Sequence, residues 1–124
     1  METKIRTFHD LKVWQESRKL VTAIYKITKS FPKDEQFGIT NQLRKASVSI
    51  ASNIAEGFGR KSIKDKVHFY TMSCGSLNEV LNQLFISKDL SYLKEKDWRD
   101  LEERIILIGK MLNGLVKKSS LLHS

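Results

Sequence analysis

Lysine and arginine are the residues of this sequence whose number and spacing best suit a chemical task, the binding of a polyanion. The 124 residues contain 22 Lys or Arg against 14 Asp or Glu, which gives a net charge of +8 at pH 7. A basic protein of this size attracts polyanions, and nucleic acid is the commonest of these in a cytoplasm. Solubility is the alternative interpretation of the same excess.

The cations gather in the segments 1–12, 60–66 and 117–124, which an up-and-down helical arrangement would bring to one end. This predicted basic pole carries a net charge of +6, whereas the opposite pole, residues 26–37 and 88–99, carries +2. The candidate nucleic-acid-binding residues are Lys4, Arg6, Lys12, Arg60, Lys61, Lys64, Lys66, Lys117 and Lys118. Without a recognition-helix motif, we expect contacts to the phosphate backbone with little base readout.

Polar side chains form a second candidate site beside a helical apolar stripe. Gln42, Ser49 and Glu56 recur at seven-residue intervals, and Asn53 lies on the edge of the stripe. Because a buried polar group without a hydrogen bond costs roughly 1–3 kcal/mol, these residues need partners. They could receive a ligand, but we favour a structural polar seam that includes Ser76 and fixes the register of two helices. Arg44 and Lys45 could project outward to RNA or pair with Glu56 and Glu79.

Residues that could support catalysis or metal binding do not form a recognisable constellation. Cys74 lies on a regular apolar stripe, which favours a core thiol over a nucleophile, and His68 stands alone. The sequence has no His-x-x-x-His, Cys-x-x-Cys or phosphate-binding glycine loop. We therefore expect no enzyme activity, no metal and no cofactor.

Four amphipathic helices are expected to position these residues, over about 10–30, 34–56, 62–89 and 94–118. Asp10 and Ser62 are the predicted N-caps of the first and third helices. Gly57-Phe58-Gly59 is predicted to end the second helix through a left-handed turn. Short connections between long helices favour an all-α, up-down-up-down antiparallel four-helix bundle, one domain over residues 1–124.

Some apolar residues remain outside the predicted core. They are Val48, Ala51 and Ala55 on the second helix, Phe69 and Val80 on the third, and Ile106, Leu107 and Met111 on the fourth. Since contiguous exposed apolar patches usually mark interfaces, we predict a homo-oligomer. Small residues on the second helix suit close approach between subunits.

Several short motifs together resemble a known family. They are Phe31-Pro32, Glu35-x-x-Gly38, Gln42-Leu43-Arg44-Lys45-Ala46, Ser49-Ile50-Ala51-Ser52-Asn53-Ile54-Ala55-Glu56-Gly57 and Gly75-Ser76-Leu77-Asn78-Glu79. Across about the whole chain, the sequence resembles the bacterial four-helix-bundle proteins encoded in 23S rRNA intervening sequences. Accessory proteins of diversity-generating retroelements look like members too. The resemblance implies a ring, a homopentamer, and it implies that Gly75 lets the second and third helices approach closely. Function is unknown for much of this family.

Localisation follows from what the sequence lacks. No apolar run approaches the roughly 20 residues that a membrane helix needs, and the N-terminus has no apolar signal-peptide core. We therefore expect a cytoplasmic protein.

The first functional hypothesis is a non-enzymatic bundle that binds RNA or DNA through its basic pole. The alternative is a protein-interaction scaffold that docks a partner such as a reverse transcriptase.

Overall fold

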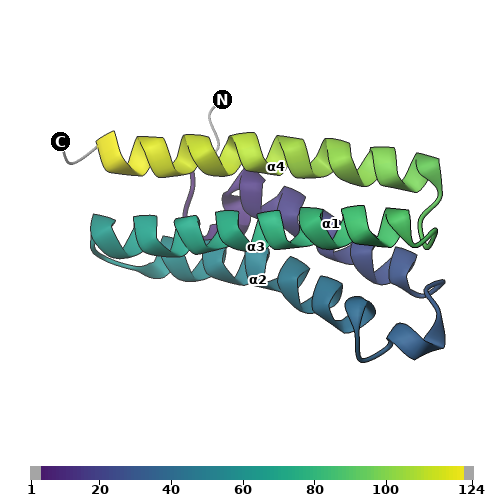
Figure 1. Cartoon of the computed structure of the whole chain (residues 1–124). Helices are drawn as coiled ribbons and strands as arrows, with labels where there is room; N and C mark the ends of the chain where they lie inside the picture. The colour runs from purple at the N-terminus through teal and green to yellow at the C-terminus, as the bar shows by residue number, and fades with distance from the viewer. Residues whose placement is uncertain (1–3, 122–124) are drawn as a thin grey trace.

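A computed structural model describes residues 4–121, and over this range the chain is helical with no strand (Figure 1). The elements in chain order are η1 (Phe8–Asp10), α1 (Lys12–Thr28), η2 (Lys33–Glu35), α2 (Ile39–Gly59), α3 (Ile63–Asp89) and α4 (Glu95–Leu121). The four α-helices pack against one another, which confirms the predicted all-α fold.

Successive helices run in opposite directions, and α4 returns to pack on α1 (Figure 1). The α2 and α3 helices share the most extensive contact. The helices differ in length: α3 and α4 have 27 residues each, whereas α1 has 17. At 1.5 Å per residue, α1 is about 15 Å shorter. The ends of α3 and α4 therefore extend beyond the start of α1.

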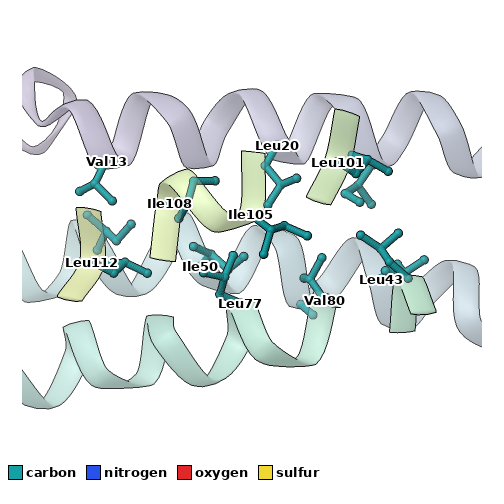
Figure 2. Close-up of a cluster of buried hydrophobic side chains, with 14 of the residues drawn as sticks. Val13, Leu20, Leu43, Ile50, Leu77, Val80, Leu101, Ile105, Ile108 and Leu112 are labelled. Atoms are coloured by element: carbon teal, nitrogen blue, oxygen red, sulfur yellow. The ribbon is translucent and has the colours of Figure 1, made fainter. Parts of the chain in front are cut away.

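The core is built from apolar side chains that recur every three or four residues on each helix. Figure 2 draws 14 of them and labels ten, with side chains from all four helices meeting along the bundle axis. Leu20, Ile50, Ile108 and Leu112 are fully buried, as their spacing predicts. Val80 is also fully buried, so its assignment to an exposed patch was wrong. It lies inside because α3 contacts both α2 and α4 and therefore buries a wide face.

The chain enters α1 differently from the prediction. The N-cap of α1 is Leu11, and Asp10 instead completes η1. The Asp10 carboxylate accepts hydrogen bonds from the backbone N–H of Arg6 at 2.9 Å and of Thr7 at 3.1 Å. These two bonds lower the pKa of Asp10 below its ordinary value of 3.8. The Asp10 side chain therefore stabilises the turn before the helix.

The α2 helix begins at Ile39 rather than near Asp34. A short turn, η2, comes first, and the chain then reverses at Gly38. Glu35 Oε1 accepts from the backbone N–H of Ile39 at 3.5 Å, so this carboxylate serves the positive end of α2 from outside the helix.

The C-terminal end of α2 also differs from the prediction. Over residues 4–121 no glycine has a positive φ, and α2 continues through Gly57 to Gly59. Gly57 is required for another reason, because a Cβ there would lie 2.7 Å from Cε1 of Tyr70 on α3. The predicted cap of α3 is confirmed, since Ser62 Oγ accepts from the backbone N–H of Asp65 at 3.1 Å. The α4 helix continues to Leu121, beyond the predicted end at residue 118.

Candidate nucleic-acid interface

One end of the bundle brings together the connection between α2 and α3 and the C-terminal end of α4 (Figure 1). Because α3 and α4 are antiparallel neighbours, the first turns of α3 lie beside the last turns of α4. We call the cations of these segments the basic tip. They are Arg60, Lys61, Lys64, Lys66, Lys117 and Lys118.

Two members of the basic tip make structural contacts. Arg60 Nη2 lies 2.7 Å from Glu56 Oε1, and the Arg60 guanidinium stacks 4.6 Å from the ring centroid of Phe69. Lys66 Nζ donates to the backbone oxygen of Phe58 at 2.7 Å, near the end of α2. A cation at this position satisfies carbonyls that the helix itself leaves unpaired. Arg60 and Lys66 therefore hold the α2 end against α3.

The remaining members of the basic tip are exposed lysines, Lys61, Lys64, Lys117 and Lys118. Among residues 4–121, none of them lies within 4.0 Å of a carboxylate oxygen. Asp65 is the one acidic residue among positions 60–66, and its carboxylate forms no ion pair within residues 4–121. In the part of the chain that the structure describes, no ion pair therefore compensates the positive charge of these four lysines.

The structure does not bring the N-terminal cations to the basic tip. Phe8 packs edge-on against Trp14, with 5.1 Å between ring centroids, and η1 contacts both α1 and α2. The segment that carries Lys4 and Arg6 consequently meets the bundle partway along its length (Figure 1). Lys12 begins α1, which starts short of the tip. The prediction was drawn from the up-and-down topology alone, and α1, with 17 residues against 27 in α3 and α4, is too short for its first residue to reach the tip.

The polar seam lies between α2 and α3, where most of its predicted residues find partners. The Ser49 and Ser76 hydroxyls lie 2.9 Å apart, and Asn53 Nδ2 donates to the Ser49 backbone oxygen at 2.9 Å. Gln83 Nε2 reaches Gln42 Oε1 and Glu79 Oε1, both at 3.3 Å. The Ser49–Ser76 and Gln42–Gln83 contacts link α2 to α3 in one register, whereas the Asn53 and Glu79 bonds each lie within one helix.

Sequence reasoning missed two residues of this seam, Gln83 and Ser73. Gln83 is 5% exposed, and Ser73 Oγ donates to the Ile50 backbone oxygen at 2.9 Å. Both residues could have been found from the antiparallel pairing of α2 with α3. Once Ser49 is opposite Ser76, Gln42 must face Gln83, and Ile50 must lie near Ser73.

Two predicted contacts of the seam, those of Glu56 and Gly75, do not form. Glu56 is exposed and pairs with Arg60 instead of a seam residue. Gly75 is exposed, and a Cβ added there would meet no heavy atom within 4 Å, so it is not the point of close helix approach. Arg44 pairs with neither Glu56 nor Glu79. Its Nε donates to Thr28 Oγ1 at 2.9 Å, which attaches α2 to the end of α1. Lys45 is exposed.

Other chemistry-bearing groups do not form a site within the part of the chain that the structure describes. No group of three or more His, Cys, Asp and Glu side chains there could hold a metal ion. Cys74 packs partly against the core, and burial raises the pKa of its thiol above the ordinary 9.0. Over the same residues, no helix is long and apolar enough to span a membrane.

Comparison with known proteins identifies the family. No curated protein is significantly similar to the chain. A crystal structure of a protein of unknown function from the S23 ribosomal protein family of Bacteroides thetaiotaomicron has the same fold, with a TM-score of 0.78. The two sequences are 19% identical, and the match covers 85% of this chain and 95% of that one. The family model described as 23S rRNA-intervening sequence protein matches residues 9–114. This chain therefore belongs to the 23S rRNA-intervening sequence protein family.

Proposed function

We propose that this protein is a non-enzymatic, cytoplasmic RNA- or DNA-binding bundle that contacts the phosphate backbone through its basic tip. The observation that carries the proposal is the group of exposed lysines, Lys61, Lys64, Lys117 and Lys118, which lie at one end of the molecule and have no carboxylate partner in the described part of the chain. Uncompensated lysines bind phosphates and release the counterions condensed on a nucleic acid. Such contacts position a backbone and carry little sequence information.

The second part of the proposal is assembly into a ring, which the family resemblance suggests is a homopentamer. Exposed apolar side chains support an oligomer: Val48 on α2 is 40% exposed, and Ile106 and Leu107 on α4 are 52% and 44% exposed. If the bundles stand side by side, their basic tips form one rim. Several tips would then bind one long polyanion with increased avidity.

The decisive experiment removes only lysines that have no structural contact. Lys61→Glu/Lys64→Glu should weaken binding to a hairpin RNA and to duplex DNA, because it replaces two phosphate contacts with repulsion. Binding is measured by fluorescence anisotropy from about 50 to 200 mM salt, a range over which counterion release changes affinity steeply. We expect the slope of log affinity against log salt to fall by about two for each tip engaged.

The matched control is Lys94→Glu/Lys96→Glu, which makes the same change in net charge at the opposite end, where both lysines are exposed. The control should bind nearly as well as the unmodified protein. Equal loss in both variants would mean that net charge alone attracts the nucleic acid, and the basic-tip proposal would be wrong. Arg60 is left unchanged because it also holds Glu56 and Phe69.

The second candidate function is a scaffold that docks a partner protein such as a reverse transcriptase. Ile106 and Leu107 favour it, because they lie together on the outer side of α4 between Glu103 and Lys110. An apolar centre with charged neighbours is typical of protein interfaces. A pure scaffold would bind neither RNA nor DNA even at low salt, so the same titration separates the two functions.

A further inference from the structure

Phe37 is the most exposed large apolar side chain among residues 4–121, at 87% of its full accessibility. The other exposed aromatic residues there, Tyr25 and Phe85, are 41% and 47% exposed. Phe37 stands between η2 and α2, next to Gly38. Exposing an entire phenyl ring to water is unfavourable, and aromatic anchors of this kind dominate the binding energy of interfaces.

The segment that carries Phe37 is held in place by backbone hydrogen bonds of the residues before and after it. Gln36 N–H donates to the Lys33 backbone oxygen and Gly38 N–H donates to the Glu35 backbone oxygen, each at 3.0 Å. The Glu35 carboxylate also accepts from the Tyr92 hydroxyl at 2.9 Å, which ties the turn to the connection between α3 and α4. Phe37 therefore projects from an ordered turn, and little conformational entropy is lost when it docks.

A shallow apolar groove runs along α1 and its border with α2. We call it the α1–α2 groove. Its wider part, about 570 Å³, is lined by Val21, Thr22, Tyr25, Lys26 and Lys29. From Val21 it continues into a cavity of about 330 Å³ lined by Phe8, Trp14, Arg18, Val48, Ala51, Ser52 and Ala55. The small side chains of α2 keep this part shallow.

We propose that Phe37 of one copy docks into the α1–α2 groove of a second copy of this chain. This inference deepens the assembly part of the proposed function and rests on it. The phenyl ring would cover Val21 and Tyr25, and both partners would remove apolar surface from water.

Charge favours the same pairing. Asp34, three residues before Phe37, is exposed and forms no ion pair within the described residues. Lys26 and Lys29 at the groove are exposed and have no carboxylate within 4.0 Å there either. Lys33, beside Asp34, is exposed too, so docking of Phe37 is favoured in the orientation that turns Asp34, and not Lys33, toward these lysines.

The position of the two surfaces determines the kind of assembly. The turn that carries Phe37 and the C-terminal part of α1 lie at the same end of the bundle (Figure 1). A contact between different surfaces at one height repeats around an axis parallel to the helices and closes into a ring if the rotation allows. All copies then point the same way, and their basic tips meet at the opposite end.

The test uses one variant of each surface. Phe37→Asp removes the anchor, and Thr22→Glu places a negative charge in the groove, where it repels Asp34. Thr22 and Phe37 are both exposed, so far-UV circular dichroism should show folded helices in both variants. Light scattering after gel filtration should show an oligomer for the unmodified protein and single chains for each variant. Ile86→Asp, which charges an exposed apolar residue of α3, should leave the oligomer intact.

Mixing the two variants is the sharper measurement. The Phe37→Asp chain keeps its groove and the Thr22→Glu chain keeps its Phe37, so together they can form one joint and should give a particle of two chains and no larger. A monomeric unmodified protein, or an unchanged oligomer in the Phe37→Asp variant, would overturn the inference. Salt-dependent nucleic-acid binding by single chains would in that case still support the basic tip, so the two proposals can fail separately.

Discussion

A single carboxylate, that of Glu35, organises the end of the bundle opposite the basic tip. One oxygen accepts from the Ile39 N–H at the start of α2, and the other accepts from the Tyr92 hydroxyl in the α3–α4 connection. A Cβ at Gly38 would lie 2.6 Å from Glu35 Oε1, so the glycine leaves room for the carboxylate. The Glu35-x-x-Gly38 motif thus has a physical cause: the carboxylate of Glu35 needs the space that a side chain at position 38 would fill.

Replacing Tyr92 with Phe should lower stability at neutral pH and have no effect at high pH. The hydrogen bond to Glu35 raises the pKa of the Tyr92 hydroxyl above its ordinary value of 10.0. A raised pKa means that the protonated hydroxyl is favoured in the folded state. The hydrogen bond of the protonated hydroxyl contributes fully to the free energy of unfolding below the pKa of Tyr92 in the unfolded chain. This contribution is lost as the pH rises through the pKa of Tyr92 in the folded protein. Urea unfolding of the unmodified protein and of Tyr92→Phe, at pH 7 and at a pH above the tyrosine pKa, measures the difference in stability at each pH.

Tyr25→Phe is the control for Tyr92→Phe, since the Tyr25 ring is exposed and its hydroxyl forms no hydrogen bond within the described residues. It should leave the urea midpoint unchanged at both pH values. A Tyr92→Phe penalty that persists at high pH would show that the hydroxyl acts through packing and not through its proton.

At the scale of the element, the close helix approach that the sequence assigned to Gly75 belongs to Gly57 instead. Gly57 is buried where α2 crosses α3, and a Cβ there would lie 2.7 and 2.9 Å from two atoms of the Tyr70 ring. Tyr70 is itself 2% exposed and has little room to move. Gly75 instead faces open space in the middle of α3. Close approach of α2 and α3 therefore depends on Gly57.

The two glycines predict opposite outcomes for the same substitution. Gly57→Ala should destabilise the bundle by about 1–3 kcal/mol, the usual cost of overpacking. Gly75→Ala should stabilise it by roughly 0.5–1 kcal/mol, because alanine loses less backbone entropy in a helix. Thermal and urea unfolding of the two variants would measure the difference. Stabilisation by Gly57→Ala would mean that Tyr70 can shift, and the close approach would not depend on the glycine.

The helices and their core could be predicted from the sequence, because a three-four spacing such as that of Trp98, Leu101, Ile105 and Ile108 depends on one helix alone. The position of Ser49 beside the apolar stripe was predictable for the same reason, whereas its pairing with Ser76 depends on the register between α2 and α3. The role of each glycine was not predictable. Gly57 faces the ring of Tyr70 and Gly75 faces open space, and which residue lies opposite a glycine depends on the register between helices.

At the scale of the whole molecule, unequal helix lengths decide which cations act together. The position of Lys4 and Arg6 could not be read from topology, because it depends on where α1 starts and on the packing of Phe8 against Trp14. The lysines of the α2–α3 connection and of the α4 end are brought together because α3 and α4 have the same length. The opposite end presents Phe37. Under the two proposals, these ends bind different partners, a polyanion and a second copy of the chain.

If both proposals hold, assembly and nucleic-acid binding must be coupled through avidity. Phe37→Asp leaves every lysine of the basic tip in place, so its affinity for an oligonucleotide short enough to contact one tip should not change. Affinity for a long strand should fall by on the order of 10²-fold, because binding by further tips of one particle is no longer intramolecular. The salt slope for the long strand should fall as well, since fewer phosphates are contacted per particle. Anisotropy titrations with a short and a long strand of the same sequence measure both effects. Equal losses on the two strands would place Phe37 at the nucleic-acid contact itself, and unchanged affinity on both would mean that the tips act independently.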